Sequence, residues 1–433
     1  MLIYKRAFAT ILATTLIFLT ACGVSNDDDP QIAPDMPYQI SNEEHLPDSE
    51  IAGEEHLQDD EEIASISLEQ RISNFKETRA DNIRGLAISI FTRDEIILEI
   101  EYGYADTAAG LAVDSDTVFA WASVTKPLVW VSVMQLYERG ELDLHADIFT
   151  YISRECFPHI IYPTTMYHLM HHTAGFYYNN ATYTTLINIE VGEAMPTLGN
   201  SLRDVSSSGI IIQNSRPGER ISYSNYGSVL AGYIVQQIAG VPFHEYVHSN
   251  IFAPLSMYHT ALLPDLSDNE WVMQQREKIK LYDPWGLLFT QQILLAHYPG
   301  GAAVGTISDM IKFARALLPD ENGGSILFEN AETLSKLHPS LEDILNAPSA
   351  GFSGEAIAFI NGFETFPDRS REAMFPRIIG HAGSLPGFIT LMYIDIDSGV
   401  GMIMSENTRH GLSTAPGFLT FFTHEIPELV SGI

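Results

Sequence analysis

The chain has 433 residues, with 55 acidic and 23 basic side chains and a formal net charge of −32. Hydrophobic residues make up 45% of it and aromatic residues 10%, which is ample for a packed core and excludes a wholly disordered chain. The acidic excess argues against a nucleic-acid-binding protein, which needs a basic surface, and against electrostatic docking on anionic lipid. Two cysteines allow at most one disulfide and no cysteine-based metal cluster.

Residues 1–21 predict a lipoprotein signal peptide. Lys5 and Arg6 precede an apolar run over 7–19, which is too short to span a bilayer as a stable anchor. The run ends at Leu19-Thr20-Ala21-Cys22, which resembles the bacterial lipobox, so Cys22 is the expected lipidation site. We therefore expect an extracytoplasmic protein, attached to a bacterial membrane only through its acyl chains. An ordinary secretory signal with a chance cysteine is the alternative.

Residues 22–66 predict an acidic tether. Between 23 and 62 there are 14 Asp or Glu residues, no Lys or Arg, and four prolines. Such a segment repels itself and cannot bury a core, so it is expected to stay extended. Metal capture by its acids and two histidines is the minor alternative. The folded domain is then expected over 67–433.

The pattern of the folded part predicts an α+β protein. In chain order the expected elements are a helix over 68–80, a strand hairpin over 85–91 and 96–104, a mostly helical region over about 120–345, three β-like runs over 377–381, 388–395 and 399–405, and a helix over 415–430. Strands at both ends suggest one antiparallel sheet, built from about 67–115 and 370–433 and flanked by helices, with the helical region inserted between them.

The segment Ser123-Val124-Thr125-Lys126 places a serine hydroxyl and a lysine amine three residues apart, a spacing that suits catalysis. The apolar segment 127–136 predicts a buried helix that ends near Gly140, so Ser123 would lie at its N-terminus, where the helix dipole favours negative charge. A desolvated lysine can accept the serine proton. By itself the spacing is weak evidence, because Ser73-Asn74-Phe75-Lys76 also matches it. We interpret Ser73 as a surface residue of an amphipathic helix.

Two further motifs follow in a fixed order. The segment 217–227 contains Tyr223-Ser224-Asn225, and the segment 380–388 contains His381-Ala382-Gly383-Ser384. Together with the serine–lysine motif they resemble the penicillin-recognising serine hydrolases, in particular the class C β-lactamase-like branch with its esterases, D-aminopeptidases and D-Ala-D-Ala carboxypeptidases. The resemblance covers about residues 75–410 and implies a β-lactamase/transpeptidase-like fold.

The resemblance also implies the role of each residue. Ser123 would be the acylated nucleophile, Lys126 would help to deprotonate it, and Tyr223 would act as general base and then as acid to the leaving group. Asn225 would bind the substrate amide or orient Lys126. The N–H groups of Ser123 and Ser384 would form the oxyanion hole.

The third motif departs from the usual Lys-Thr-Gly of the family. Gly383 would still let substrate backbone approach the strand closely, but His381 is mostly neutral at pH 7 and Ala382 has no hydroxyl. Recognition of a substrate carboxylate should be weakened, so true β-lactamase activity is not expected. A purely structural role for His381 at the strand edge is the alternative.

We expect a monomeric serine hydrolase without metal or cofactor, acting on an ester, a D-residue peptide or a small amide, including peptidoglycan-derived ones. One alternative is a cell-surface binding lipoprotein of the same fold that has lost turnover. Another is a zinc metalloprotease, because His244-Glu245-Tyr246-Val247-His248 matches a zinc-binding pattern. No third ligand helix is evident, so we interpret Glu245 and His248 as exposed helix residues. His171 and His172 are expected to be packing and turn residues.

Overall fold

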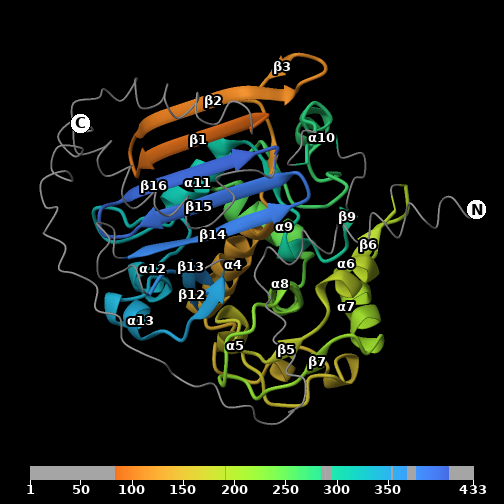
Figure 1. Cartoon of the computed structure of the whole chain (residues 1–433). Coiled ribbons are helices and arrows are strands. Elements are labelled where there is room, and N and C mark those ends of the chain that lie inside the picture. The colour runs from red at the N-terminus through yellow and green to blue at the C-terminus, as the bar shows by residue number, and fades with distance from the viewer. Residues whose placement is uncertain are drawn as a thin grey trace, which may run out of the picture.

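A nine-stranded antiparallel sheet dominates one side of the molecule (Figure 1). The computed structural model describes residues 83–190, 192–283, 288, 294–352, 355–367 and 377–408. The strand order is β11-β12-β13-β14-β15-β16-β1-β2-β3. The strands are β1 (Gly85–Thr92), β2 (Ile96–Asp106), β3 (Leu111–Ala112), β11 (Ala350–Phe352), β12 (Glu355–Ile360), β13 (Phe363–Thr365), β14 (Ile378–Leu385), β15 (Phe388–Asp395) and β16 (Val400–Glu406).

The two ends of the folded part meet in the middle of this sheet. Strand β1 pairs with β2, which follows it directly, and also with β16 from the other end, so that Ile88 lies opposite Ile100 on one side and Met404 on the other. The alternating side chains of β1 are buried on both faces, as are all those of β15 and β16. The predicted antiparallel sheet built from both ends of the chain is confirmed.

The C-terminal part of the sheet begins earlier than predicted. Strands β11 to β13 occupy 350–365, whereas the sequence suggested a start near 370. These strands are short, and the small and polar residues within them obscure the alternation that marks a half-buried strand. The difference matters for the site, because β13 lies directly beside β14.

Ten helices of the described part lie between and beside the strands. They are α4 (Lys126–Glu138), α5 (Met166–Met170), α6 (Asn180–Ile187), α7 (Leu198–Ser207), α8 (Asn225–Ala239), α9 (Phe243–Val247), α10 (Glu270–Arg276), α11 (Ile307–Ala316), α12 (Ala331–Leu337) and α13 (Leu341–Asn346). Helix α11 packs against β1, β15 and β16, while α4 contacts α8, α12 and β14 (Figure 1). Helix α4 is therefore enclosed by other elements.

Several short elements connect these helices. They are β4 (Phe119–Ala120), β10 (Val304–Gly305) and β8 (Thr260–Ala261) in one small sheet, β5 (Phe176–Tyr177) paired with β7 (Ile212–Gln213), β6 (Asn188–Ile189) paired with β9 (Leu294–Leu295), the single-turn helices η1 (Ala122–Thr125), η2 (Ile148–Thr150), η3 (Arg154–Cys156) and η5 (Tyr298–Gly300), and a π-helical turn η4 (His248–Phe252).

Local sequence explains the bounds of the two central helices. Helix α4 has Pro127 in its first turn, where a missing N–H costs nothing, and every residue from Lys126 to Leu136 is buried. It ends just before Gly140, whose φ of 71° fits glycine, as the sequence predicted. Helix α8 begins where the Ser224 hydroxyl accepts a hydrogen bond from the N–H of Gly227 at 3.0 Å.

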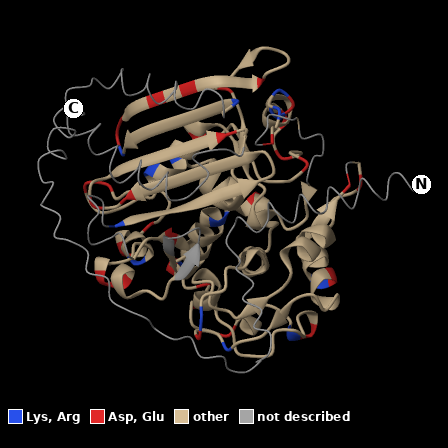
Figure 2. Ribbon diagram, in the orientation of Figure 1, with Lys and Arg blue, Asp and Glu red and all other residues tan. Residues whose placement is uncertain are grey.

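The acidic character of the sequence extends into the folded part (Figure 2). Strand β2 carries the exposed Glu99 and Glu101 near one edge of the sheet. Within the described ranges, no helix is long and apolar enough to cross a bilayer. The predicted helices over 68–80 and 415–430, the signal peptide, the tether and Cys22 lie outside the described residues.

Candidate active site

The turn that carries Ser123 is fixed from several sides. Strand β4 leads into η1, which holds Ser123 and continues directly into α4 at Lys126. The Thr125 hydroxyl donates to the carbonyl of Ala122 at 2.7 Å and accepts from the N–H of Ala303 at 3.0 Å. These bonds hold Ser123 at the entrance of α4, as the sequence predicted.

The residue before Ser123 has an uncommon backbone conformation. Ala122 has a φ of 48°, in the left-handed region that a residue with a side chain rarely occupies. Such a conformation costs on the order of 1–3 kcal/mol and persists only where the surroundings impose it. Here β14 lies against the turn: a Cβ added to Gly383 would be 2.2 Å from the carbonyl oxygen of Trp121 and 3.1 Å from the nitrogen of Ser123. Gly383 therefore permits a close approach between β14 and η1.

Two other side chains lie within hydrogen-bonding distance of the Ser123 hydroxyl. Lys126 Nζ lies 2.9 Å from Ser123 Oγ, and the Tyr223 hydroxyl lies 3.0 Å from the same oxygen. Lys126 has no exposed surface, and its Nζ also donates to the carbonyl of Gly300 at 2.6 Å. The same Nζ lies 5.1 Å from the centre of the Tyr223 ring. The structure thus brings the predicted serine, lysine and tyrosine within direct hydrogen-bonding distance.

Tyr223 rests on a buried histidine that the sequence did not link to it. The rings of His172 and Tyr223 lie 4.5 Å apart, and the N–H of Ser224 donates to His172 Nδ1 at 3.1 Å. Because Nδ1 accepts, the neutral ring carries its proton on Nε2. Burial, together with the positive charge of Lys126, holds the pKa of His172 well below the ordinary imidazole value. His172 is therefore a neutral packing and turn residue, as predicted, with a φ of 51°.

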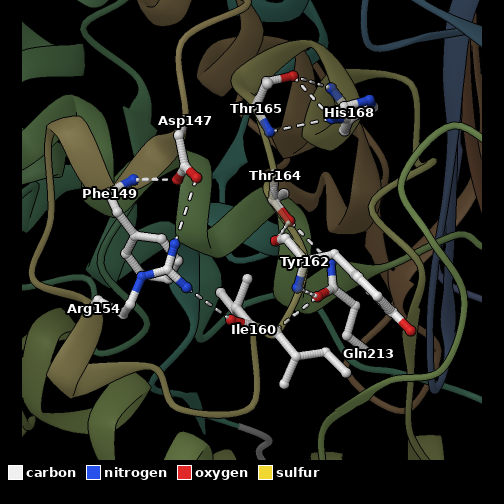
Figure 3. Close-up of polar contacts among 10 residues, drawn as sticks. Asp147, Phe149, Arg154, Ile160, Tyr162, Thr164, Thr165, His168 and Gln213 are labelled. Atoms are coloured by element: carbon white, nitrogen blue, oxygen red, sulfur yellow. Dashed lines mark hydrogen bonds and ion pairs between the residues drawn. The ribbon is translucent and has the colours of Figure 1, made fainter.

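The segment before His172 is anchored by Gln213 of β7 (Figure 3). The Gln213 carbonyl oxygen accepts from the N–H groups of Ile161 and Tyr162, at 2.9 and 2.8 Å. Its amide nitrogen donates to the hydroxyl of Thr164 and to the carbonyl of Ala174, at 2.9 and 2.8 Å. One buried side chain thereby links the chain on both sides of α5. This arrangement fixes the loop that positions His172 under Tyr223.

The third motif lies on β14, and its histidine is buried. His381 is 1% exposed, and its ring lies 6.0 Å from that of Tyr223. Its Nδ1 lies 2.7 Å from the carbonyl of Ala382 and 3.3 Å from a carboxylate oxygen of Glu364. Burial, reinforced by the charge of Lys126, lowers the pKa of His381 to about 3. His381 is therefore neutral at physiological pH and supplies no fixed positive charge.

Glu364 is the site-proximal residue that sequence reasoning missed. It lies on β13 behind the third motif, where its carboxylate accepts from the N–H of Ala382 at 2.9 Å and from the hydroxyl of Tyr393 at 2.6 Å. Burial raises the pKa of Glu364 to about 7, although these two hydrogen bonds oppose the rise. Glu364 and His381 thus lie in close contact, at 3.3 Å, in a setting where burial disfavours charge on both side chains. No motif marked this glutamate, because its position depends on the pairing of β13 with β14.

The remaining predicted site residues border the same centre. Asn225 begins α8 beside η5. A Cβ added to Gly300 of η5 would lie 3.6 Å from the carbonyl oxygen of Asn225. Ser384 follows Gly383 on β14 and is partly exposed. Ser384 therefore lies on a strand that contacts the Ser123 turn, while Asn225 begins a helix that contacts α4 and η5.

The zinc-binding pattern does not form a cluster. Glu245 and His248 are exposed, as predicted, and only 243–247 belong to α9, while His248 begins a π-helical turn. Among the residues that the structure describes, no group of three or more His, Cys, Asp or Glu side chains is arranged to hold a metal ion.

Comparisons with known proteins agree with this architecture. The chain is 24% identical to penicillin-binding protein 4* of Bacillus subtilis, over 77% of this chain and 72% of that protein. It is 32% identical to esterase EstB of Burkholderia gladioli over 40% of this chain, and spans only 45% of that esterase. The D-amino acid amidase of Ochrobactrum anthropi, solved with L-phenylalanine amide, superposes with a TM-score of 0.61 at 23% identity, covering 83% of this chain and 95% of that one. The predicted β-lactamase/transpeptidase-like fold is thereby confirmed.

The family model described as Beta-lactamase matches residues 68–417. This match includes the Ser123 turn, the Tyr223 segment and strand β14, and it extends over much more than half of the chain. The chain belongs to the Beta-lactamase family.

Proposed function

We propose that this chain is a serine hydrolase that forms an acyl-enzyme through Ser123 and acts on a small ester or on an amide of a D-amino acid. The observation that carries the proposal is the Ser123 oxygen, which lies 2.9 Å from the buried Lys126 amine and 3.0 Å from the Tyr223 hydroxyl. Membership of the family supports the hydrolase class. The esterase and the D-amino acid amidase among its relatives support the substrate class.

Acylation uses the three side chains together. The Ser123 oxygen forms a bond to the substrate carbonyl carbon while its proton passes to the Lys126–Tyr223 pair. The Lys126 ammonium stabilises negative charge on the neighbouring oxygens. Tyr223 then returns the proton to the departing alcohol oxygen or amine nitrogen as the C–O or C–N bond breaks.

Deacylation reverses these proton transfers with water as the nucleophile. A water molecule attacks the acyl carbon and gives a proton to the same pair. The Ser123 oxygen leaves and takes that proton back, and the carboxylic acid is released. In both steps the N–H groups of Ser123 and Ser384 stabilise the oxyanion, and Asn225 binds the substrate amide. The narrow gap that Gly383 permits supports this placement.

The third motif bears on the substrate class. His381 is neutral, because its pKa lies near 3, and Ala382 offers no hydroxyl. The motif therefore lacks the charge and hydroxyl that would hold the carboxylate of a β-lactam. We expect ester and D-amide hydrolysis to exceed β-lactam hydrolysis.

The same proposal includes location and assembly. The lipobox at Cys22 and the acidic tether support a lipid-anchored enzyme outside the cytoplasm, which would meet ester or peptide fragments derived from peptidoglycan. The proposed enzyme acts as a monomer.

The decisive experiment is intact mass spectrometry after incubation of the full chain, purified in detergent, with a fluorophosphonate. We expect a single adduct on the wild type and none on Ser123→Ala. Ser73→Ala is the matched control, because it removes the serine of the other Ser-x-x-Lys match. An adduct that survives in Ser123→Ala would contradict the proposed nucleophile. No adduct on any variant would favour the non-catalytic binding lipoprotein.

A further inference from the structure

A small cavity of about 80 Å³ is lined by residues that directly follow, in the sequence, two residues of the proposed reaction centre. Leu385 and Pro386 line it and directly follow Ser384 on β14. Gly301 and Ala302 also line it and directly follow Gly300, whose carbonyl accepts a hydrogen bond from Lys126. The volume is several times the roughly 10–15 Å³ that a water molecule needs, so a short chain of a few heavy atoms fits.

The cavity is apolar except for one side chain. Among its described lining residues, Arg276 at the end of α10 is the single charged one. The Arg276 guanidinium lies 5.0 Å from the ring centre of Phe388, which also lines the cavity. One terminal nitrogen, Nη1, donates a long hydrogen bond of 3.4 Å to the carbonyl of Ile279. The cavity is thus an apolar slot with a guanidinium in its wall.

Arg276 has no acidic partner among the residues that the structure describes. Burial alone lowers the pKa of Arg276 to about 10, so the side chain remains positively charged at neutral pH. Arg276 is only partly exposed, and a partly desolvated charge without a counter-charge is costly; here it occurs in a chain with 55 acids. Its contacts leave Nε and Nη2 available, and these two N–H groups can bind one carboxylate side-on.

The direction of β14 indicates which half of a substrate would enter the cavity. Tyr223, which gives the proton to the leaving group in the proposed mechanism, lies near His381 at the start of the motif. The cavity lies at the other end of the motif, beyond Ser384, beside Leu385 and Pro386. The leaving group therefore points towards the His381 end and the acyl group towards the cavity.

We infer that this cavity receives the acyl chain of the substrate and that Arg276 binds a carboxylate at the end of that chain. The preferred substrates are then esters or amides of a short acyl group that carries a second carboxylate. The inference rests on the proposed function and names the substrate class of the same site. Arg276 is a specificity-determining residue and takes no part in proton transfer.

The test compares two esters with the same leaving group: p-nitrophenyl glutarate, with a free carboxylate, and its methyl ester, which is neutral. We expect the wild type to show a kcat/KM about ten-fold or more higher for the free acid, as one charge-assisted, desolvated contact can provide. Arg276→Met should remove this preference while changing kcat/KM for the methyl ester less than about two-fold, because the apolar stem is kept. Arg276→Lys should retain part of it.

Lys278→Met is the matched control. It removes the same charge two residues away, from an exposed side chain that does not line the cavity, and should leave the preference unchanged. Thermal unfolding of each variant shows whether its fold is intact. Equal losses on both esters in Arg276→Met, or no preference in the wild type, would overturn the inference while the proposed hydrolase remains. Failure of the wild type to hydrolyse either ester or to react with a fluorophosphonate would instead overturn the proposed function.

Discussion

Glu364 accepts a hydrogen bond at 2.9 Å from the backbone N–H of Ala382, so a buried carboxyl group lies directly behind the third motif. Burial raises the pKa of Glu364 to about 7, against 4.5 for a free side chain, so the stability that this group contributes depends on pH. Its contribution to the free energy of unfolding is fully present below pH 4.5 and is lost as the pH rises through 7. The total loss of unfolding free energy from this group is on the order of 3 kcal/mol.

We therefore predict that Glu364→Gln, whose side chain cannot ionise, will lose less stability than the wild type as the pH rises. Between pH 5 and 8 the melting temperature of the wild type should fall more than that of the variant. The measurement is thermal unfolding of both proteins across this range. Parallel curves would show that Glu364 does not titrate in the folded state near pH 7.

A second prediction concerns the gap between β14 and the Ser123 turn. Gly383→Ala should abolish fluorophosphonate labelling and lower the melting temperature, because the new Cβ would lie 2.2 Å from the Trp121 carbonyl oxygen. Gly227→Ala is the control, because there the nearest atoms are 3.5 Å away, an ordinary contact. Labelling rates that are equal in the two variants would contradict the tight packing.

His172 should support Tyr223 without exchanging protons in the pH range of activity. We predict that His172→Phe lowers kcat about 10- to 100-fold with little change in KM, because the N–H of Ser224 loses its acceptor and the Tyr223 ring shifts. Steady-state kinetics on a neutral p-nitrophenyl ester measures the effects on kcat and on KM separately. A change confined to KM would instead place His172 in substrate binding.

The pH–rate profile distinguishes His381 from a general base. Because the pKa of His381 lies near 3, its ring is protonated only far below physiological pH. His381→Asn should therefore change the height of the kcat/KM profile between pH 5 and 9 but not its shape. Loss of an inflection near pH 6.5 in the variant would show that the histidine titrates during turnover.

Zinc chemistry gives a final prediction. Treatment with EDTA should leave hydrolysis unchanged, and so should His248→Ala, because His248 is an exposed side chain of the η4 turn. Activity assays with and without added Zn²⁺ provide the measurement. Chelator-sensitive activity that is lost in His248→Ala would restore the metalloprotease hypothesis.

The parts of the site that the sequence predicted are those encoded locally. Ser123 and Lys126 are three residues apart in one turn, and the mostly apolar run behind them predicted the buried helix α4. Tyr223 and His381 needed the order of the three motifs and the family resemblance, since neither is distinctive alone. The sheet followed from strand patterns at both ends of the chain.

The parts that the sequence did not predict depend on long-range pairing. Glu364 is an acid in a short polar-containing strand, and it becomes a buried partner of the third motif only because β13 pairs with β14 through Glu364 and Gly380. Arg276 ends a short helix with exposed neighbours, which in sequence is typical of a solvated surface. Its position in the cavity wall depends on packing beside Phe388, more than a hundred residues further along the chain.

The pairing of β1 with β16 joins the first and the last strand of the described chain. Ser123, Lys126 and Tyr223 are all synthesised well before β14 to β16, so a nascent chain carries these three side chains before the strand that lies against the Ser123 turn exists. Contacts between such distant segments form late and slowly. In the proposed mechanism, any product truncated before residue 378 would carry these three side chains without the strand that lies against the Ser123 turn.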